Sequence, residues 1–267
     1  MSALERELGA SLINRGVRPW TLTAAGELLY ERAETALAEL ALAEADLAAL
    51  ATGETGQVRV ASVPSGLRSV VPLAAAAFRA RHGDIQLLLA ESQSSAILKQ
   101  LRGDEVDVGI IVTPGGHPPA VPRHLTATLL VEQPLMVVVP ASSPIARLKR
   151  VTLEQLRDEE WLLPSPRRVA DFREEVDALF REAEYTPRMA LELEDDVAGQ
   201  ALVAAGLGIA LIPSLAAPTP RPDLRTIPLQ PARARALHVI TARGPHRKPV
   251  TTFVRELERA ANKLTLP

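Results

Sequence analysis

The chain has 267 residues, of which 47% are apolar, 3% aromatic and 23% charged, and its formal net charge is −2. Such a composition is that of a globular protein long enough for two compact units, and it argues against a disordered chain, a strongly basic nucleic-acid-binding protein and an acidic tail. Because the sequence contains no cysteine, disulfides, thiol catalysis and thiolate metal sites are excluded.

The first ten residues, MSALERELGA, predict a short helix and no secretory leader. Glu5, Arg6 and Glu7 stand where a signal peptide would need an apolar run, and Gly9 is a helix stop. No later stretch approaches the roughly 18 consecutive apolar residues of a membrane span. We therefore expect a cytoplasmic protein with no membrane contact.

A second, much longer helix is predicted over residues 23–52. Thr23 can cap its first amides, and the segment runs to Gly53 without a proline. At about 1.5 Å per residue, such a helix is a rod of roughly 45 Å, too long to be buried in a small globule. Its apolar residues follow spacings of three, four and seven: Tyr30, Ala33, Leu37, Leu40, Leu47 and Ala51, with Glu44 interrupting the series. This pattern is typical of a coiled-coil seam, so we favour pairing with a second copy over packing against the chain's own domain.

From residue 57 the pattern changes to apolar strands that alternate with helices. The predicted elements of the first block are strand 57–63, helix 65–83, strand 85–92, helix 94–105 and strand 106–112. Those of the second block are strand 134–140, helix 152–159, strand 161–165, helix 171–183, strand 188–194, helix 197–206 and strand 209–213. Continuous apolar strands separated by helices are typical of parallel sheets, so the predicted fold class is α/β with two lobes. A last strand, 236–243, and a last helix, 250–264, could return to close the first lobe.

The motifs of the chain, taken in order, resemble those of the LysR-type transcriptional regulators. The N-terminal residues match the pattern L-E-x-x-L-G-x-x-L-F-x-R-x-x-R followed by L-T-x-A-G, with Ile13 in place of the usual phenylalanine. Four later stretches resemble landmarks of the same family in the same order: FRARHGDIQLLLAE, LRGDEVDVGIIV, LVEQPLMVVVPASSPIA and LVAAGLGIALIP. The resemblance covers essentially the whole chain.

This resemblance implies a winged helix-turn-helix, a dimerising linker helix and an effector domain with the two-lobed fold of a type 2 periplasmic binding protein. Residues 1–22 would be the end of the recognition helix and the wing, 23–52 the linker helix, and 57–267 the effector domain. Within that domain, lobe I would comprise about 57–132 and 236–267, and lobe II about 133–235. The implied function is regulation of promoter DNA in response to a small-molecule effector, by a homodimer or tetramer that needs no cofactor.

The DNA-binding residues implied by the resemblance are Arg15 and Arg18 in the wing and Thr23 at the start of the linker helix. Cationic wing residues can reach phosphates or a minor groove. In the family, however, roughly thirty residues precede the position of Met1 and include the base-reading half of the recognition helix. Residues 1–52 also hold four arginines against eight acidic residues. We therefore expect a partial helix-turn-helix, with sequence-specific binding of promoter DNA only if the full helix-turn-helix is present. Three explanations for the missing part remain open: a start codon placed too late, a cut chain, or a truncated regulator that only senses or dimerises.

Effector-binding residues are expected where the carboxyl ends of the strands of both lobes meet, because helix N-termini there supply amides to a ligand. The candidates from the first lobe are Ser65, Gly66, Ser94 and Ser95, and those from the second lobe are Ser165, Arg167 and Val197. The resemblance supports Ser65 and Ser94 as effector contacts, and a role limited to capping helices remains open for both. Because amides and hydroxyls converge there, our hypothesis is a carboxylate effector.

An enzyme finds no support in the sequence. The five histidines lack metal-ligand spacing, and the GLG stretch at 206–208 follows a helix and precedes a strand, which indicates a helix C-cap and no phosphate loop. The acidic run that contains Glu194 and Asp195 favours helix capping over acid–base chemistry. Two alternatives to a regulator remain: a solute-binding protein, and a stand-alone small-molecule sensor without DNA binding.

Overall fold

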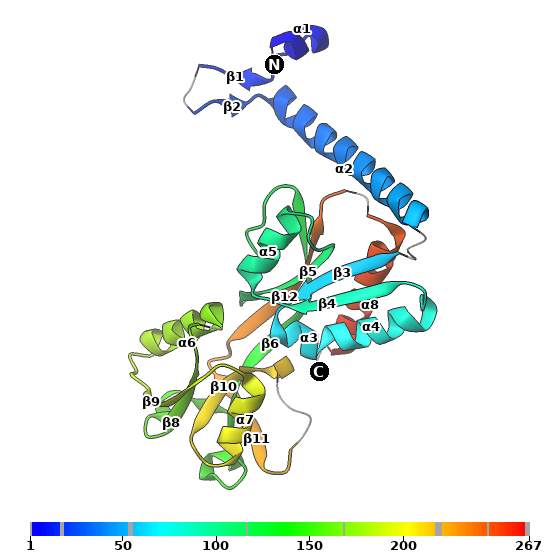
Figure 1. Cartoon of the computed structure of the whole chain (residues 1–267). Coiled ribbons are helices and arrows are strands. Elements are labelled where there is room, and N and C mark those ends of the chain that lie inside the picture. The colour runs from blue at the N-terminus through cyan, green and yellow to red at the C-terminus, as the bar shows by residue number, and fades with distance from the viewer. Residues whose placement is uncertain are drawn as a thin grey trace.

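A computed structural model describes residues 2–16, 19–52, 56–115, 117–167, 169–216, 221–244 and 246–264. Figure 1 shows three parts along the chain: a small N-terminal unit, a long helix that projects from the body, and an α/β body made of two halves. The first half of the body follows the long helix, and the second half lies farthest from it.

The N-terminal unit consists of α1 (Ser2–Leu8) and a small antiparallel pair, β1 (Ile13–Asn14) and β2 (Thr21–Leu22). Gly9 ends α1 with a positive φ of 66°, as predicted. The long helix α2 (Ala24–Thr52) begins after Thr23, whose Oγ1 accepts a hydrogen bond from the Gly26 amide at 3.1 Å. The predicted cap is therefore confirmed.

In the first half of the body, three parallel strands lie in the order β4–β3–β5. The elements are β3 (Gln57–Ser62), α3 (Pro64–Arg68), α4 (Val70–Arg81), β4 (Gln86–Glu91), α5 (Ser94–Arg102) and β5 (Val108–Pro114). The single helix predicted over 65–83 is wrong, since the chain breaks at Ser69 into α3 and α4. Pro72 has no amide hydrogen to donate to the carbonyl of Arg68, so a continuous helix would lack that bond.

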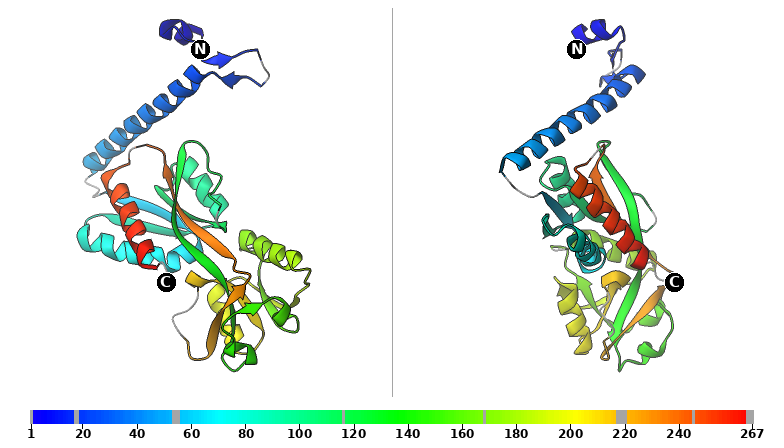
Figure 2. Two further views of the ribbon diagram at one scale, coloured as in Figure 1. Left: turned by 180° about the vertical axis from the view of Figure 1, so that it is seen from behind. Right: turned by 90° about the vertical axis from the view of Figure 1, so that its right-hand side faces the viewer.

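One strand is shared by both halves. β6 (Leu125–Pro140) is 16 residues long. Its first part pairs with β12 (Ala234–Ala242), which also pairs with β5, while its last part pairs with β10 (Ile209–Pro213) and β11 (Leu224–Gln230). Figure 2 shows β6 and β12 side by side as they pass from one half into the other. The sequence predicted a strand only over 134–140, so the shared part of β6 was missed, as was β11.

The second half is built on β8 (Glu160–Pro164), which lies parallel to β9 (Arg188–Leu193) and β10. Its helices are α6 (Ala170–Glu182) and α7 (Asp196–Ala204), and short 3-10 turns lie at Pro144–Arg147 (η1), Glu154–Leu156 (η2) and Ser214–Ala216 (η3). The predicted helix 152–159 is wrong: Val151–Thr152 forms β7 beside β11, and η2 follows it. The side chain of Gln155 accepts the Thr152 amide at 2.9 Å and so closes a tight turn.

Aromatic side chains form a buried centre in each half. In the first half, Phe78 of α4 meets Phe253 of α8 (Lys248–Leu264) edge to face, with ring centroids 5.5 Å apart. Figure 2 shows α8 lying across this half beside α4. In the second half, Trp161 packs on Phe180 and its indole N–H donates to the Tyr185 hydroxyl at 2.9 Å. Each half therefore has its own core.

Asp107 ties the start of β3 to the segment that enters α8. Its carboxylate accepts from the Arg59 amide at 2.8 Å, from the Arg59 guanidinium at 2.9 Å and from Arg247 at 3.1 Å. Burial alone would raise the pKa of Asp107, but the hydrogen bonds and charges of Arg59 and Arg247 outweigh it and hold the pKa below its usual value. β3 is the first element after α2 in the chain, so this contact anchors the strand that follows the long helix.

We expect Asp107→Ala to lower the free energy of unfolding by about 3 kcal/mol, because it leaves Arg59 and Arg247 without their shared carboxylate. A depressed pKa stabilises the fold above the unfolded pKa of about 3.9 and ceases to do so as pH falls through the folded pKa. The difference between wild type and variant in urea melts should therefore shrink between pH 6 and pH 3. Glu154→Ala, which removes an exposed pair with Arg157, is the control. A difference that does not change with pH would contradict this assignment.

Candidate functional site

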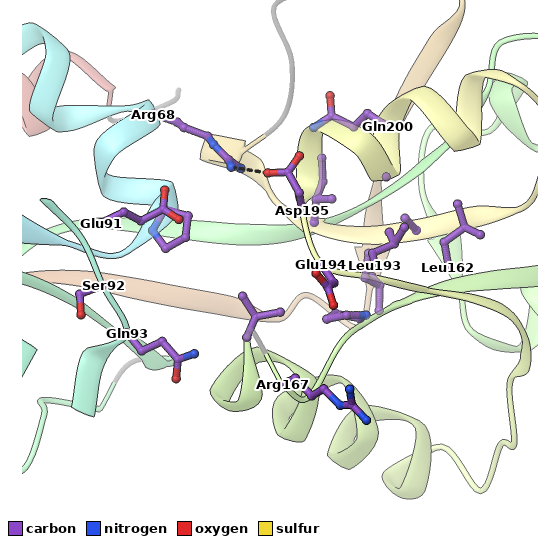
Figure 3. A pocket seen from close by; sticks show the side chains of 17 residues that line it. Arg68, Glu91, Ser92, Gln93, Leu162, Arg167, Leu193, Glu194, Asp195 and Gln200 are labelled. Atoms are coloured by element: carbon purple, nitrogen blue, oxygen red, sulfur yellow. Dashed lines mark hydrogen bonds and ion pairs between the residues drawn. The ribbon is translucent and has the colours of Figure 1, made fainter. Parts of the chain in front are cut away.

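A cavity of about 350 Å³ lies between the two halves of the body (Figure 3). It opens where β4, β8 and β9 end, which is where open α/β sheets bind ligands. The first half lines it with Pro64, Arg68, Glu91, Ser92 and Gln93. The second half lines it with Leu162, Pro164, Arg167, Val169, Leu193, Glu194, Asp195, Gly199, Gln200, Ala210, Leu211 and Ile212. Its size is within the range of small-molecule sites.

An ion pair crosses this cavity. The Arg68 guanidinium at the end of α3 lies 3.1 Å from one carboxylate oxygen of Asp195, which precedes α7 (Figure 3). The other oxygen of Asp195 accepts the amides of Val197 and Ala198, both at 2.8 Å, and so caps α7. The side chains of Arg68 and Asp195 are 29% and 48% exposed. Such a solvated pair stabilises by about 0.2–1 kcal/mol, so it biases the two halves toward contact without locking them.

A smaller cavity of about 60 Å³ adjoins the first and shares Pro64, Gln93 and Val169 with it. Its other lining residues are Val63, Ser65, Ser94, Val112, Ala170, Asp171, Phe172, Pro213 and Arg235. Arg235 lies 2.7 Å from Glu175 and stacks 4.6 Å from the ring centre of Phe172. Burial raises the pKa of Glu175, and the charge of Arg235 offsets part of that effect. A buried guanidinium, paired with a buried carboxylate, therefore forms part of the lining of the small cavity.

Of the predicted effector residues, Ser65 and Ser94 line the small cavity and Arg167 lines the large one. Ser65 is no helix cap, since it lies inside α3 and its hydroxyl accepts from Gln133 Nε2 at 3.3 Å. Ser94 is the first residue of α5 and accepts the Val112 amide at 3.3 Å. The capping roles considered for both residues are thus wrong.

The remaining predicted residues lie outside both linings. A Cβ on Gly66 would come within 2.3 Å of Ser62 Oγ, so Gly66 serves close packing. Ser95 is exposed, and Ser165 is buried with its amide donating to the Leu193 carbonyl at 2.7 Å. Val197 is exposed, and its amide is already bound by Asp195.

Several lining residues were missed by sequence reasoning. Arg68 lies one helical turn after Ser65, a spacing that places both on one helix face and could have singled it out. Gln200 is buried and donates to the Ala216 carbonyl at 3.0 Å. Gln133 was missed as well: it lines neither cavity but is wholly buried behind Ser65, in the part of β6 that was not predicted as a strand.

The N-terminal motif residues hold the wing against α2. Glu5 accepts the Leu12 amide at 2.8 Å and the Arg15 guanidinium at 2.7 Å, and the bond from Leu12 is the main reason why the pKa of Glu5 is lowered. Thr23 donates to the Ser11 carbonyl at 2.6 Å in addition to capping α2. A Cβ on Gly26 would come within 2.1 Å of the Leu12 carbonyl oxygen, so only glycine allows this approach.

Two of the predicted DNA-binding residues therefore have structural roles, because Arg15 pairs with Glu5 and Thr23 caps α2. Arg18 lies outside the described residues. Within the described ranges, no helix is long and apolar enough to cross a membrane. The same ranges contain no group of three or more His, Asp or Glu side chains that could hold a metal ion.

Residues 51–262 match the family described as the LysR substrate binding domain. The chain belongs to the LysR family. It is 32% identical over 251 residues to the HTH-type transcriptional regulator TfdS of Cupriavidus pinatubonensis, a match that covers 93% of this chain and 82% of TfdS. It is also 33% identical over 214 residues to the regulator CbbR of Xanthobacter flavus, covering 79% of this chain and 62% of CbbR. Membership makes this LysR chain a transcriptional regulator and no enzyme.

Solved structures agree with this assignment. Full-length BenM superposes with a TM-score of 0.65 at 26% identity, covering 100% of this chain and 88% of BenM. The BenM effector binding domain with its effector benzoate gives a TM-score of 0.66 at 25% identity, covering 79% of this chain and 96% of that domain. The predicted fold, a type 2 periplasmic-binding-protein-like effector domain after an N-terminal helical segment, is confirmed.

We expect Ser65→Ala to lower the free energy of unfolding by about 1–2 kcal/mol, because it removes the acceptor of the buried Gln133 amide. Ser95→Ala is the matched control and should change stability by less than about 0.5 kcal/mol, since Ser95 is exposed. Urea melts of the two variants check this. Equal stability of both would mean that the contact between Ser65 and Gln133 contributes nothing.

Proposed function

We propose that this LysR regulator binds a small carboxylate in the cavity between its two halves and transmits the binding event to a dimer held by α2. The observation that carries the proposal is the ion pair that crosses the cavity, because it places a guanidinium where a ligand would touch both halves. Guanidinium groups match carboxylates in geometry and charge. Benzoate, the effector of the BenM domain, is a carboxylate of suitable size.

The dimer would form along the apolar face of α2. Tyr30, Leu37, Leu40 and Leu47 are all largely exposed in the single chain, whereas apolar side chains at these spacings are buried in coiled coils. The side chain of Ala51 lies outside the described residues. α2 approaches its own body through Glu27 and Arg123, a largely exposed ion pair at 3.7 Å, which leaves the seam uncovered. A homodimer, or a tetramer built from two such dimers, would cover it.

Promoter DNA would be contacted by the unit of α1, β1 and β2. Thr23 and Gly26 join this unit to the start of α2, and Glu5 joins α1 to β1 within the unit. A change in the angle between paired α2 helices would therefore move both wings. Such a regulator would act in the cytoplasm, with the chromosome. The acidic balance of residues 1–52 and the pairing of Arg15 with Glu5 favour a second candidate, a sensor that binds effector without binding DNA itself.

A thermal-shift screen tests the carboxylate. We expect small carboxylates, with benzoate and shikimate in the panel, to raise the melting temperature, because a ligand at 100 times its dissociation constant stabilises the fold by about 2.7 kcal/mol. Amides of the same acids are the controls and should have no effect. Stabilisation by cations or neutral apolar molecules alone would contradict the proposal.

A single substitution on α2 tests the dimer. Leu40→Glu should convert a particle of at least twice 28.7 kDa into a monomer in size-exclusion chromatography with light scattering, because it places charges in the seam. Leu28 is the matched control, since it is exposed to the same 58% as Leu40 but lies off the seam. Leu28→Glu should remain dimeric. A wild-type chain that is monomeric at micromolar concentration would overturn the role given to α2.

A further inference from the structure

Asp195 occupies the place that a ligand carboxylate would take. One of its oxygens faces the amides that begin α7, and the other faces the Arg68 guanidinium of the opposite half. A carboxylate that joins a helix N-terminus to an arginine has the contacts expected of a bound anion. Here that anion is supplied by the protein itself.

Resting on the proposed function, we propose that Arg68 is the residue that recognises the effector's carboxylate and that Asp195 is its counter-ion in the ligand-free protein, displaced when the effector binds. Arg68 thereby determines specificity for one ligand class, small molecules with a single carboxylate.

Asp195 can release Arg68 without losing its contacts to α7. Its capping oxygen has two amide donors within α7, so Asp195 keeps these bonds when its other oxygen leaves Arg68. The pair is half exposed on the Asp195 side, so water can replace Arg68 there. Release therefore costs little, while a ligand carboxylate on Arg68 gains a charged hydrogen bond inside a cavity.

The other charges of the lining restrict the ligand to one negative group. Glu91 faces the cavity from the first half and Glu194 from the second, and Figure 3 shows them on opposite walls. Neither carboxylate has an ion-pair partner among the side chains that the structure describes. Arg167 adds one positive charge, so the lining as a whole, with Arg68 and Asp195, carries three acids against two arginines. A second carboxylate on the ligand would meet repulsion from Glu91 and Glu194.

Calorimetric titration with benzoate and phthalate, which differ by one carboxylate, tests the proposal. Benzoate should bind at least tenfold more tightly than phthalate. Arg68→Gln should weaken benzoate at least tenfold, and Asp195→Asn, which keeps the cap of α7, should strengthen it about threefold to fivefold. Asp223→Asn removes an ion pair with Arg221 within the second half and should change neither affinity. Benzoate affinity unchanged in both Arg68→Gln and Asp195→Asn, or lost in Arg167→Gln alone, would overturn the assignment to Arg68.

A second measurement, of the distance between spin labels on the two halves, tests the Arg68–Asp195 ion pair in the absence of ligand. Because the chain has no cysteine, Arg79→Cys in α4 and Arg181→Cys in α6 give two unique sites for spin labels, one on each half. Asp195→Asn and Arg68→Gln should each lengthen and broaden the label-to-label distances, while Asp223→Asn leaves them unchanged. Unaltered distances in both would contradict the pairing across the cavity. Failure of wild type and Asp195→Asn alike to bind any carboxylate, with altered distances, would instead count against the carboxylate of the proposed function.

Discussion

The continuity of β6 is the constraint on which the rest of the structure depends. This strand pairs with β12 up to Pro134 and with β10 from Leu135 onward, so the two halves are joined through one sheet. Pro134 lies where the partner changes and has no amide hydrogen to add to either ladder. The neighbouring Leu135 amide donates to the Arg233 carbonyl at 2.7 Å, so both crossing strands are held together at this point. β6 and β12 therefore connect the two halves, and the large cavity is lined by residues of both.

The connection through β6 and β12 determines how contacts across the cavity act on the two halves. Arg68 and Asp195 are separated by 127 residues in sequence, and only the fold brings them together. Under the proposal, a small rotation about β6 and β12 would separate them. Behind the small cavity, Arg235 of β12 reaches Glu175 of α6, so the second half is also tied to the crossing strand itself. On the other side, Asp107 fixes the base of the first half next to the segment that follows α2. A ligand that changes the angle between the halves would thus act on a rigid unit joined to the long helix.

Sequence reasoning succeeded where the signal is local. The apolar runs of β3, β5, β8 and β10 predicted buried parallel strands, and Thr23 and Gly9 marked helix ends that the structure confirms. It failed where neighbours far along the chain decide the outcome. The start of β6 mixes buried and exposed residues, and threonine, glutamate and glutamine interrupt its apolar residues. Its pairing partner β12 lies about a hundred residues later. The pairing of Arg68 with Asp195 was missed for the same reason, since only the fold brings these two residues together. Val197, which was predicted and lies near Asp195 in sequence, is outside both linings.

The central claim is that a small carboxylate is held between the two halves. Hydrogen–deuterium exchange of the full chain, with and without the carboxylate that stabilises it most, tests this directly. The account predicts slower exchange in three segments that meet only at the cavity: α3, residues 91–95 and the first turn of α7. Slower exchange confined to α8 or β11, with no change in those three segments, would contradict it.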